Sequence, residues 1–263
     1  WGRLAVRDST ARESWLRAMT GTRSSRANAF REREMVLDLF EMACGARITY
    51  NYIRLGGVML DIPAEWMMKC REFLNYFKGK LKEYDDLLTY NPIFMDRTKT
   101  AGLISAQQAV NWGLSGPTLR GSGVAYDVRK ANPYCVYDKL DFKVCIGDNG
   151  SCWDRYYVRM QEMTQSIYLV EQCLDQLPAG DFMAKGVAKM PKPLPGEAYA
   201  HVEGSRGDLG IYLVSAGGFS PYRMHVRPPS FINLAILQEI LVGLKVSDMI
   251  AVLGSIDIVL GEV

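Results

Sequence analysis

The chain has 263 residues, of which 48% are hydrophobic and 23% charged, a composition typical of a globular protein and not of a disordered one. The 31 basic and 29 acidic residues give a net charge of +2, and basic residues are dense only near the N-terminus. This distribution argues against a nucleic-acid binder. No run of about 18 apolar residues is present that could span a bilayer alone. We expect one large core or two small ones.

The cysteines and histidines do not have the spacing of a metal site. The six cysteines form no C-x-x-C pair, and His201 and His225 lie far from most of them in the sequence. We therefore expect no metal bound by this chain and reduced thiols. No dinucleotide fingerprint accompanies Gly121-Ser122-Gly123, so NADH is not expected to bind here. The chain begins at Trp1 and not at Met, which suggests a fragment of a longer protein.

The first half of the chain predicts three helices. Residues 1–29 show little periodicity, and we predict no regular element there. Apolar residues then recur at helical spacing over 30–45 and again over 63–84, where a proline opens the pattern. A shorter helix is predicted to start at Ser105 and to end before Gly113. Residues 115–123 are too rich in glycine and proline for a regular element.

The second half predicts the longest helix, a small sheet and two apolar helices. Ser151 and Asp154 have the spacing of a capping box, and an apolar seam follows over 151–177, as in a helix packed in a bundle. Ser230 and Ser247 are expected to cap two helices that reach about Gly243 and Gly254. Alternating segments after a Pro/Lys-rich connector predict antiparallel strands over 197–202, 209–215 and 224–227.

Several charged residues invite a functional interpretation. His201 and Glu203 would share one face of a strand, and an ordinary exposed pair is the favoured interpretation. The arginines around the glycine-rich loop and the strands could contact an acidic partner or a cofactor's charge, but internal ion pairs are favoured. This set comprises Arg120, Asp127, Arg129, Arg206, Arg223 and Arg227.

The C-terminal tail is apolar except for two carboxylates, Asp257 and Glu262. A carboxylate in apolar surroundings tends to have a raised pKa, which makes it a candidate for proton handling. A helix-end carboxylate that faces solvent or an arginine explains the pattern equally well. Both interpretations stay open at this point.

Seven segments resemble, in collinear order, the quinone-pocket subunit of respiratory complex I-type NADH:quinone oxidoreductases, in its bacterial and plastid forms. They are FREREMVLDLFEMACGAR (30–47), NYIRLGGVMLDIP (51–63), NWGLSGPTLRGSGVAYDVRKANPY (111–134), CWDRYYVRMQEM (152–163), GDLGIYLVSAG (207–217), PYRMHVRPPSFINL (221–234) and LGSIDIVLGEV (253–263). The resemblance covers about residues 30–263 and implies one domain there. Residues 1–29 do not match, and a frameshift upstream of about Ala29 would explain them.

The resemblance implies an α+β, mainly α fold with a helical-bundle core and a small antiparallel sheet, like that of [NiFe]-hydrogenase large subunits. It also implies a subunit of a proton-translocating NADH:quinone oxidoreductase that acts in electron transport and is inactive as an isolated chain. The quinone would be reduced beside the terminal [4Fe–4S] cluster of a neighbouring subunit, while NADH binds elsewhere in the complex. The expected partners are other complex I subunits, above all the cluster-bearing and the membrane-embedded quinone-site subunits. The expected location is peripheral, on the cytoplasmic, matrix or stromal side of an energy-transducing membrane.

Site residues follow from the resemblance position by position. Positions that match Asp257 and Val259 line or neighbour the quinone cavity, and Phe30 matches an aromatic on the cavity side. The tail that contains Asp257 and Val259 has no thiol, whereas hydrogenase large subunits hold nickel there with a cysteine pair. A stand-alone hydrogenase is therefore disfavoured.

Three further residues, Glu262, Arg47 and Arg54, are expected to set charge and guide protons near the cluster and the pocket. Thr49 replaces a histidine of many relatives whose protonation follows the redox state of the cluster, so coupling at this point should depend less on pH. The family's headgroup-binding His and Tyr belong to an N-terminal part that this sequence does not contain.

Two alternatives to the NADH-driven enzyme remain. The same quinone module could receive electrons from ferredoxin or a deazaflavin donor, because the donor binds elsewhere. The chain could also be a scaffold subunit without a role in chemistry. An Asp257→Asn substitution separates the scaffold from the enzyme.

Overall fold

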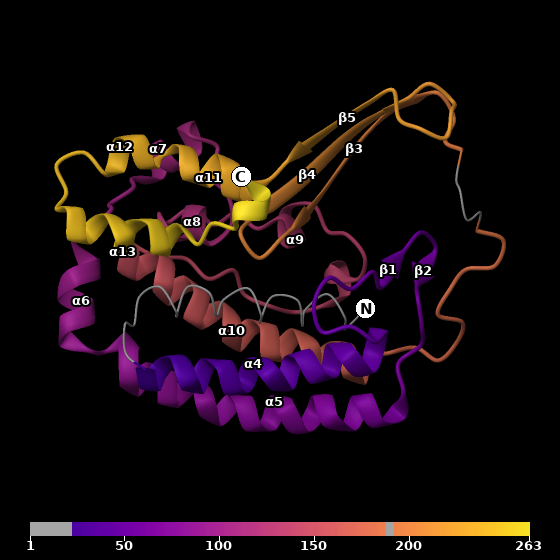
Figure 1. The fold of residues 1–263 in the computed structure, drawn as a ribbon, viewed down its shortest axis with the longest axis horizontal. Helices are drawn as coiled ribbons and strands as arrows, with labels where there is room; N and C mark the ends of the chain where they lie inside the picture. Colours follow the sequence, from indigo (N-terminus) through magenta and orange to yellow (C-terminus); the bar gives the residue numbers. More distant parts are fainter. Residues whose placement is uncertain (1–22, 188–191) are drawn as a thin grey trace.

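A computed structural model describes residues 23–187 and 192–263, and in residues 23–30 it describes the backbone alone. Three long helices lie side by side and form the lower layer in Figure 1. They are α4 (Arg23–Cys44), α5 (Ala64–Tyr84) and α10 (Cys152–Asp175). The predicted helices over 30–45, 63–84 and 151–177 are thereby confirmed, although α4 begins before Phe30.

The bundle is held by the apolar seams that its sequences predict. Trp66, Phe73 and Phe77 of α5 are buried with Leu39 of α4 and Ile167 of α10 in one core cluster. Burial of an aromatic or aliphatic side chain stabilises the fold by roughly 1.5–3 kcal/mol each. At the start of α10, Ser151 and Asp154 form the predicted capping box, with both reciprocal hydrogen bonds present.

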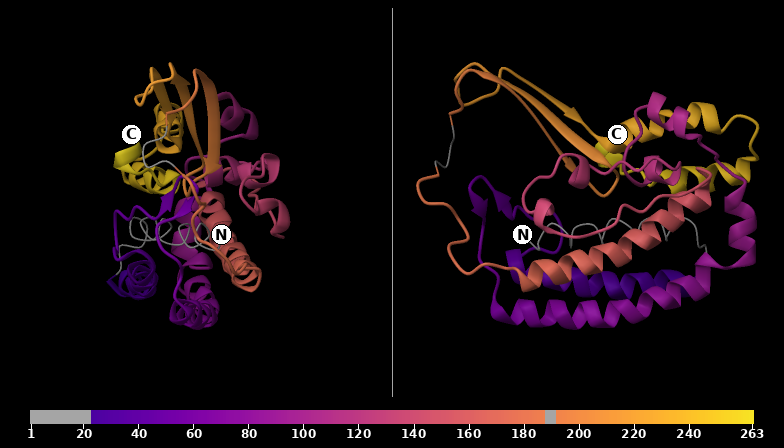
Figure 2. Two further views of the ribbon diagram at one scale, coloured as in Figure 1. Left: turned by 90° about the vertical axis from the view of Figure 1, so that its right-hand side faces the viewer. Right: turned by 180° about the vertical axis from the view of Figure 1, so that it is seen from behind.

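A second layer of short helices lies against α10 of the lower layer (Figures 1 and 2). Helix α10 therefore contacts α5 on one side and α8 and α13 on the other. The two layers are joined at one end by a π-helical turn (Asp85–Thr89) and α6 (Pro92–Lys99), which no sequence pattern predicted. The second layer contains α7 (Ala106–Asn111), α8 (Gly116–Gly121), α9 (Val128–Ala131), a 3-10 turn (Tyr137–Lys139), α11 (Pro229–Ala235), α12 (Leu237–Ile240), α13 (Val246–Ile256) and a last 3-10 turn (Leu260–Glu262).

The expectation that residues 115–123 form no regular element is wrong, because α8 lies there and is entirely buried. Its glycines permit close approach and do not break the helix. A Cβ at Gly116 would lie 2.5 Å from the Cα of Gly207, and one at Gly121 would lie 2.8 Å from the Cγ of Arg155. Pro117 sits in the first turn, where a missing N–H costs nothing.

The sheet has the predicted strands, β3 (Gly196–Glu203), β4 (Asp208–Ser215) and β5 (Arg223–Arg227), in the antiparallel order β3-β4-β5. It projects from the second layer, as both views show (Figure 2). Since alternate residues share a face, the register gathers a continuous run of apolar side chains on one face. These are Ala198, Ala200, Val202, Leu209, Ile211, Leu213, Met224 and Val226. A two-residue pair, β1 (Ile53–Arg54) and β2 (Gly57–Val58), follows α4.

The predicted caps of the last two helices are wrong. Pro228 and Lys245 occupy the N-cap positions of α11 and α13, and neither Ser230 nor Ser247 caps. Ser230 instead donates a hydrogen bond to Glu262 and accepts one from the Val259 amide. The serine therefore fastens the C-terminal tail to α11, a long-range contact that a local capping rule cannot foresee.

Among the helices of the described ranges, none is long and apolar enough to cross a membrane.

Candidate functional site

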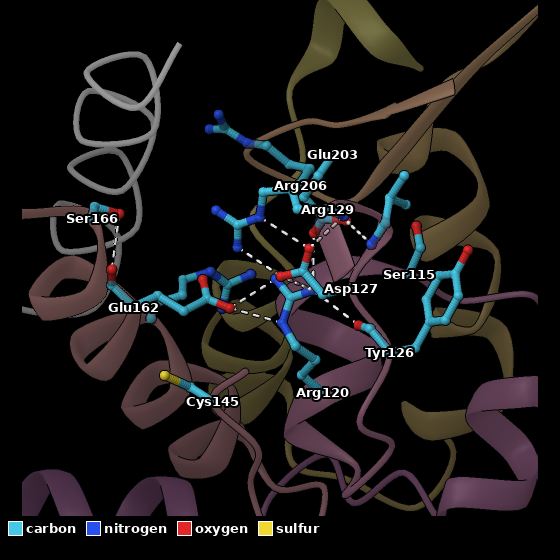
Figure 3. A network of polar contacts seen from close by, with 12 residues as sticks. Ser115, Arg120, Tyr126, Asp127, Arg129, Cys145, Glu162, Ser166, Glu203 and Arg206 are labelled. Atoms are coloured by element: carbon cyan, nitrogen blue, oxygen red, sulfur yellow. Dashed lines mark hydrogen bonds and ion pairs between the residues drawn. The ribbon is translucent and has the colours of Figure 1, made fainter. Parts of the chain in front are cut away.

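A set of charged side chains is buried where α8, α9, α10, the β3–β4 turn and the end of α13 meet. Figure 3 shows several of them converging from different elements. They separate into two groups that share α10. We call Arg120, Asp127, Arg129, Glu162 and Glu203 the carboxylate network, and Arg155, Arg159, Arg206 with Asp257 the arginine cluster.

Arg120, at the centre of the carboxylate network, is completely enclosed. Its Nε and Nη2 atoms lie 2.8 and 2.7 Å from Oε1 of Glu162, and its Nη1 donates to Oε1 of Glu203 at 2.9 Å. Asp127, the N-cap of α9, accepts from Nη2 and Nε of Arg129 at 2.6 and 2.9 Å. The network therefore ties β3 and α10 to α8 and α9 through charge-assisted hydrogen bonds.

Burial and neighbouring charge act in opposite directions in this network. Burial would lower the pKa of Arg120, but Glu162, Glu203 and Asp127 together raise it above its usual value. Burial would raise the pKa of Asp127, but the hydrogen bonds and charge of Arg129 lower it. For Glu203 burial prevails over Arg120, and its pKa is raised.

The arginine cluster surrounds the C-terminal turn of α13. Arg159 donates to the main-chain oxygens of Ser255 at 2.8 Å and Ile256 at 3.3 Å, and Arg206 donates to that of Asp257 at 3.1 Å. Helix C-termini favour cations because their last carbonyl groups point outward. Burial lowers the pKa of Arg159 to about 10, although Asp257 and Glu162 act in the opposite direction. The cluster thus gathers its guanidinium groups around one helix C-terminus.

Asp257 ends α13 in the left-handed conformation, with a φ of 59°. Its side chain is buried, and its Oδ1 and Oδ2 lie 3.4 Å from Nη2 of Arg206 and 3.9 Å from Nε of Arg159. Asp257 is thus a helix-end carboxylate that faces two arginines, and its part in proton handling stays a prediction. It lies in the interior, where removing the charge leaves buried cations behind.

Val259 and Glu262 follow Asp257 in the C-terminal tail. Both hydrogen-bond to Ser230, Val259 through its main chain and Glu262 through its side chain. Val259 is half-buried, and its amide donates to Ser230 at 3.2 Å. Glu262 accepts from the hydroxyl of the same serine. Both residues therefore follow directly from the turn at Asp257, in a tail anchored by Ser230.

The remaining predicted site residues lie elsewhere. Arg47 follows α4 and is paired at the surface with Glu34, Asp38 and Glu41. Arg54 is exposed in β1, and the β1–β2 pair lies away from α13 in Figures 1 and 2. Phe30 belongs to the backbone of α4, and its side chain is outside the described part of the chain.

The expectation that His201 and Glu203 form an ordinary exposed pair is wrong. Glu203 is buried against Arg120. The Nδ1 atom of His201 lies 3.0 Å from Oδ1 of Asp208, and its Nε2 atom lies 2.9 Å from Nδ2 of Asn132. The favoured internal ion pairs are confirmed for the buried arginines of the carboxylate network, for Arg206 and for Arg227, which lies 3.9 Å from Asp208. Arg223 is exposed.

Three residues of the site were not identified from the sequence: Arg155, Arg159 and Glu162. Their spacing of four and three residues puts them on one face of α10. Charged residues that repeat on the same helix as an apolar seam are a signal that could have identified them. Within the described ranges no group of His, Cys, Asp or Glu is arranged to hold a metal ion, and Cys70, Cys152 and Cys173 are buried free thiols.

This fold and its polar centre define a mainly helical α+β subunit organised around buried arginines. The chain belongs to the family described as respiratory-chain NADH dehydrogenase, 49 kDa subunit, whose model matches residues 20–194 and 185–263. From the resemblance we expected the domain to begin at residue 30. The match to the family begins at residue 20, and α4 begins at Arg23.

Curated relatives agree with the family. The chain is 52% identical over 234 residues to the D-type subunit of NADH-quinone oxidoreductase from Desulforamulus reducens, a match that covers 89% of this chain and 64% of the relative. It is 48% identical to the protein of the same name in Bacillus cytotoxicus, with the same coverage. It is 44% identical to an H-type subunit of NAD(P)H-quinone oxidoreductase from Gloeobacter violaceus, covering 89% and 65%. The chain thus spans just under two-thirds of the length of these relatives.

A solved structure has the same fold. A chain of an archaeal membrane-bound sulfane sulfur reductase, a respiratory membrane complex, superimposes with a TM-score of 0.93 and 38% identity, covering 98% of this chain and 72% of that one. The expected α+β, mainly α fold is confirmed. The comparison also shows that the fold occurs in a complex named for sulfur reduction, so the fold alone does not define the electron acceptor.

Proposed function

We propose that this chain forms part of the quinone-reduction site of a proton-translocating NADH:quinone oxidoreductase. The observation that carries the proposal is the buried Asp257 carboxylate between Arg159 and Arg206. The names of the relatives at 44–52% identity support an acceptor of the quinone class over sulfur. The names do not establish the electron donor, so a ferredoxin or deazaflavin donor is the alternative.

The chemistry of quinone reduction suits an arginine-rich site with one carboxylate. A quinone takes up two electrons and two protons to become a quinol, and negative charge develops on its carbonyl oxygens before protons arrive. Fixed guanidinium groups near the end of α13 would stabilise that charge without having to reorganise. A carboxylate beside them could hold or transfer a proton.

The partners and the setting follow from this proposal. The electrons would come from a [4Fe–4S] cluster on a neighbouring subunit, and a membrane-embedded subunit would complete the quinone site. NADH would bind elsewhere in the complex, and the isolated chain would be inactive. The subunit would be peripheral, on the cytoplasmic, matrix or stromal side of an energy-transducing membrane.

Within this site, Asp257, Val259 and Phe30 are proposed to border the quinone. Glu262 is proposed to carry charge at the anchored end of the tail. Arg47 and Arg54 lie apart from the turn at Asp257, so their proposed part is in charge or proton transfer toward a partner subunit and not in contact with the quinone.

The experiment is Asp257→Asn in the assembled complex, which keeps the shape of the side chain and one acceptor oxygen but removes the charge. We expect quinone reduction to fall by about 100-fold, as for removal of a catalytic acid or base, with assembly preserved. Assembly is measured by the amount of the variant chain in the purified complex. NADH oxidation with a soluble one-electron acceptor that bypasses the quinone site shows that the donor side is intact.

Asp248→Asn is the matched control. Asp248 lies in the first turn of the same helix, where it pairs with Arg97 at the surface. Its substitution should leave turnover unchanged. Equal turnover in the two variants and in the unsubstituted complex would contradict the proposal and favour the scaffold subunit.

A further inference from the structure

Arg155 is a buried arginine whose contacts in the described ranges are all with uncharged groups. It is fully enclosed and lies in the first turns of α10. Its Nη1 donates to the Gly150 carbonyl at 2.8 Å, and its Nη2 donates to the Gly102 carbonyl at 2.9 Å. Nη2 also lies 3.3 Å from Sγ of Cys152. Burial lowers the pKa of this guanidinium.

A buried cation held in this way is costly, because it loses hydration without a hydrogen bond to a carboxylate of the described residues. Its location is also unfavourable, since the N-terminal end of a helix repels positive charge. Among the residues that the structure describes, Arg155 forms no ion pair. What it does provide is a rigid, planar set of donors that reaches three separate segments, the loops at Gly102 and Gly150 and the last turn of α13.

The contact with α13 is made to Ser255. Nε of Arg155 donates to Oγ of Ser255 at 2.9 Å, and this hydroxyl in turn donates to the Val252 carbonyl at 2.7 Å. Ser255 is fully buried, and its main-chain oxygen accepts from Arg159. Arg155 thus binds the side chain of Ser255 and Arg159 binds its main-chain oxygen. Both contacts hold the last turn of α13, two residues before Asp257.

We propose that Arg155 is a positioning residue for the quinone site, which acts through Ser255 to fix the turn that presents Asp257. The inference depends on the proposed function of Asp257. It adds a residue that acts on the carboxylate through the backbone of α13 and, under the proposal, does not contact the substrate.

The conformation of Asp257 explains why the turn needs such support. A residue other than glycine in the left-handed region costs of order 1–3 kcal/mol of strain and persists only where the surroundings impose it. If the hydrogen bond to Ser255 is lost, α13 can unwind at its end. The carboxylate then moves relative to Arg206 and Arg159.

The test compares two serines of the same helix in the assembled complex. Ser255→Ala removes the hydroxyl that accepts from Nε of Arg155. Ser247→Ala removes a hydroxyl near the start of α13 that lies 3.4 Å from the exposed Arg97. Each variant is assayed for kcat and KM of quinone reduction, for NADH oxidation with the bypassing acceptor, and for amide hydrogen exchange over residues 256–259.

We expect Ser255→Ala to lower kcat for quinone by about 10- to 100-fold, the scale for a small misplacement of a reacting group. The bypass activity should be retained, and exchange over 256–259 should become faster. Ser247→Ala should change none of these quantities. A purely structural role predicts instead that quinone and bypass activities fall in parallel, which would overturn the proposal.

Arg155→Lys keeps the charge but loses the planar donors, so it should reproduce the loss of kcat even if Ser255→Ala fails to assemble. Normal quinone turnover in Arg155→Lys, with Asp257→Asn impaired, would reject the positioning role and leave the proposed function intact. Normal turnover in Asp257→Asn as well would reject the proposed function itself.

Discussion

The two groups of buried charge share α10 but hold their arginines in different ways. In the carboxylate network, Arg120 and Arg129 are bound by side-chain carboxylates from three different elements. In the arginine cluster, main-chain carbonyls are prominent acceptors for Arg155 and Arg159. One group thus pairs each arginine with carboxylates, whereas the other holds an excess of positive charge in a fixed place.

The difference suggests that one group serves mainly the stability of the fold and the other mainly the chemistry of the site. A network in which guanidinium groups bind side-chain carboxylates is suited to joining elements. A cation held by carbonyl dipoles keeps much of its field, which can act on a substrate or on a neighbouring carboxylate. We therefore expect changes in the carboxylate network to affect folding first and changes in the arginine cluster to affect turnover first.

The largest effect on stability should come from Arg120→Ala. The substitution leaves the buried carboxylates of Glu162 and Glu203 without their shared cation, and breaking a buried pair costs about 3–5 kcal/mol. Denaturant unfolding followed by tryptophan fluorescence measures the loss. A loss no greater than that of an exposed arginine such as Arg223→Ala would show that the network does not support the fold.

Asp127→Asn should have a smaller effect that depends on pH. The pKa of Asp127 is lowered in the folded chain, so its stabilisation is complete above the unfolded pKa of about 3.9 and is lost as the pH falls through the folded pKa. At pH 7 the substitution should cost about 1.5–3 kcal/mol, the scale for hydrogen bonds to charged groups. The difference between the variant and the unsubstituted chain should shrink toward acid, and a difference that does not change with pH would contradict the assignment.

Gly150→Ala tests the backbone of a residue whose carbonyl accepts from Arg155 of the arginine cluster. Gly150 has a φ of 69°, and a Cβ there would overlap the carbonyl oxygen of Ile104. Strain alone should cost about 1–3 kcal/mol and should displace an acceptor of Arg155. Gly79→Ala, on the exposed side of α5 with no atom near the new Cβ, is the control and should stabilise by about 0.5–1 kcal/mol. Equal unfolding midpoints for the two variants would contradict the role of Gly150.

The smallest effect on stability is expected from Arg47→Ala. Its three partners are all surface carboxylates of α4, and exposed ion pairs contribute little. The denaturation midpoint of the chain should stay unchanged. Under the proposed part of Arg47 in charge or proton transfer, the quinone turnover of the assembled complex should fall, and unchanged turnover would contradict that part.

Local patterns were sufficient for the elements that depend on local chemistry. The helices α5 and α10 and the strands β3 to β5 follow from apolar periodicity, and the capping box at Ser151 follows from spacing. The pattern failed where tertiary contacts determine the structure. Helix α8 contains glycines that allow close packing, and Ser230 hydrogen-bonds to the tail and not to its own helix.

The site was predictable only in part for the same reason. Asp257 could be singled out because it is a carboxylate in an apolar tail. Its neighbours Arg159 and Arg206 are distant in the sequence, and no pattern connects them to it. Glu203 was predicted to be exposed. Strand alternation shows which face of the sheet a residue lies on, but it does not show which other elements cover that face.

The left-handed turn at Asp257 also has an evolutionary consequence. Glycine adopts this backbone conformation freely, and asparagine and aspartate adopt it at a lower cost than most other residues. A single base change converts an aspartate codon into one for either of the others. Descendants of such a gene could therefore exchange a charged, a neutral or an absent side chain at this position while the turn itself is inherited unchanged. A lineage could in this way alter the chemistry at the end of α13 in one step, without passing through a misfolded intermediate.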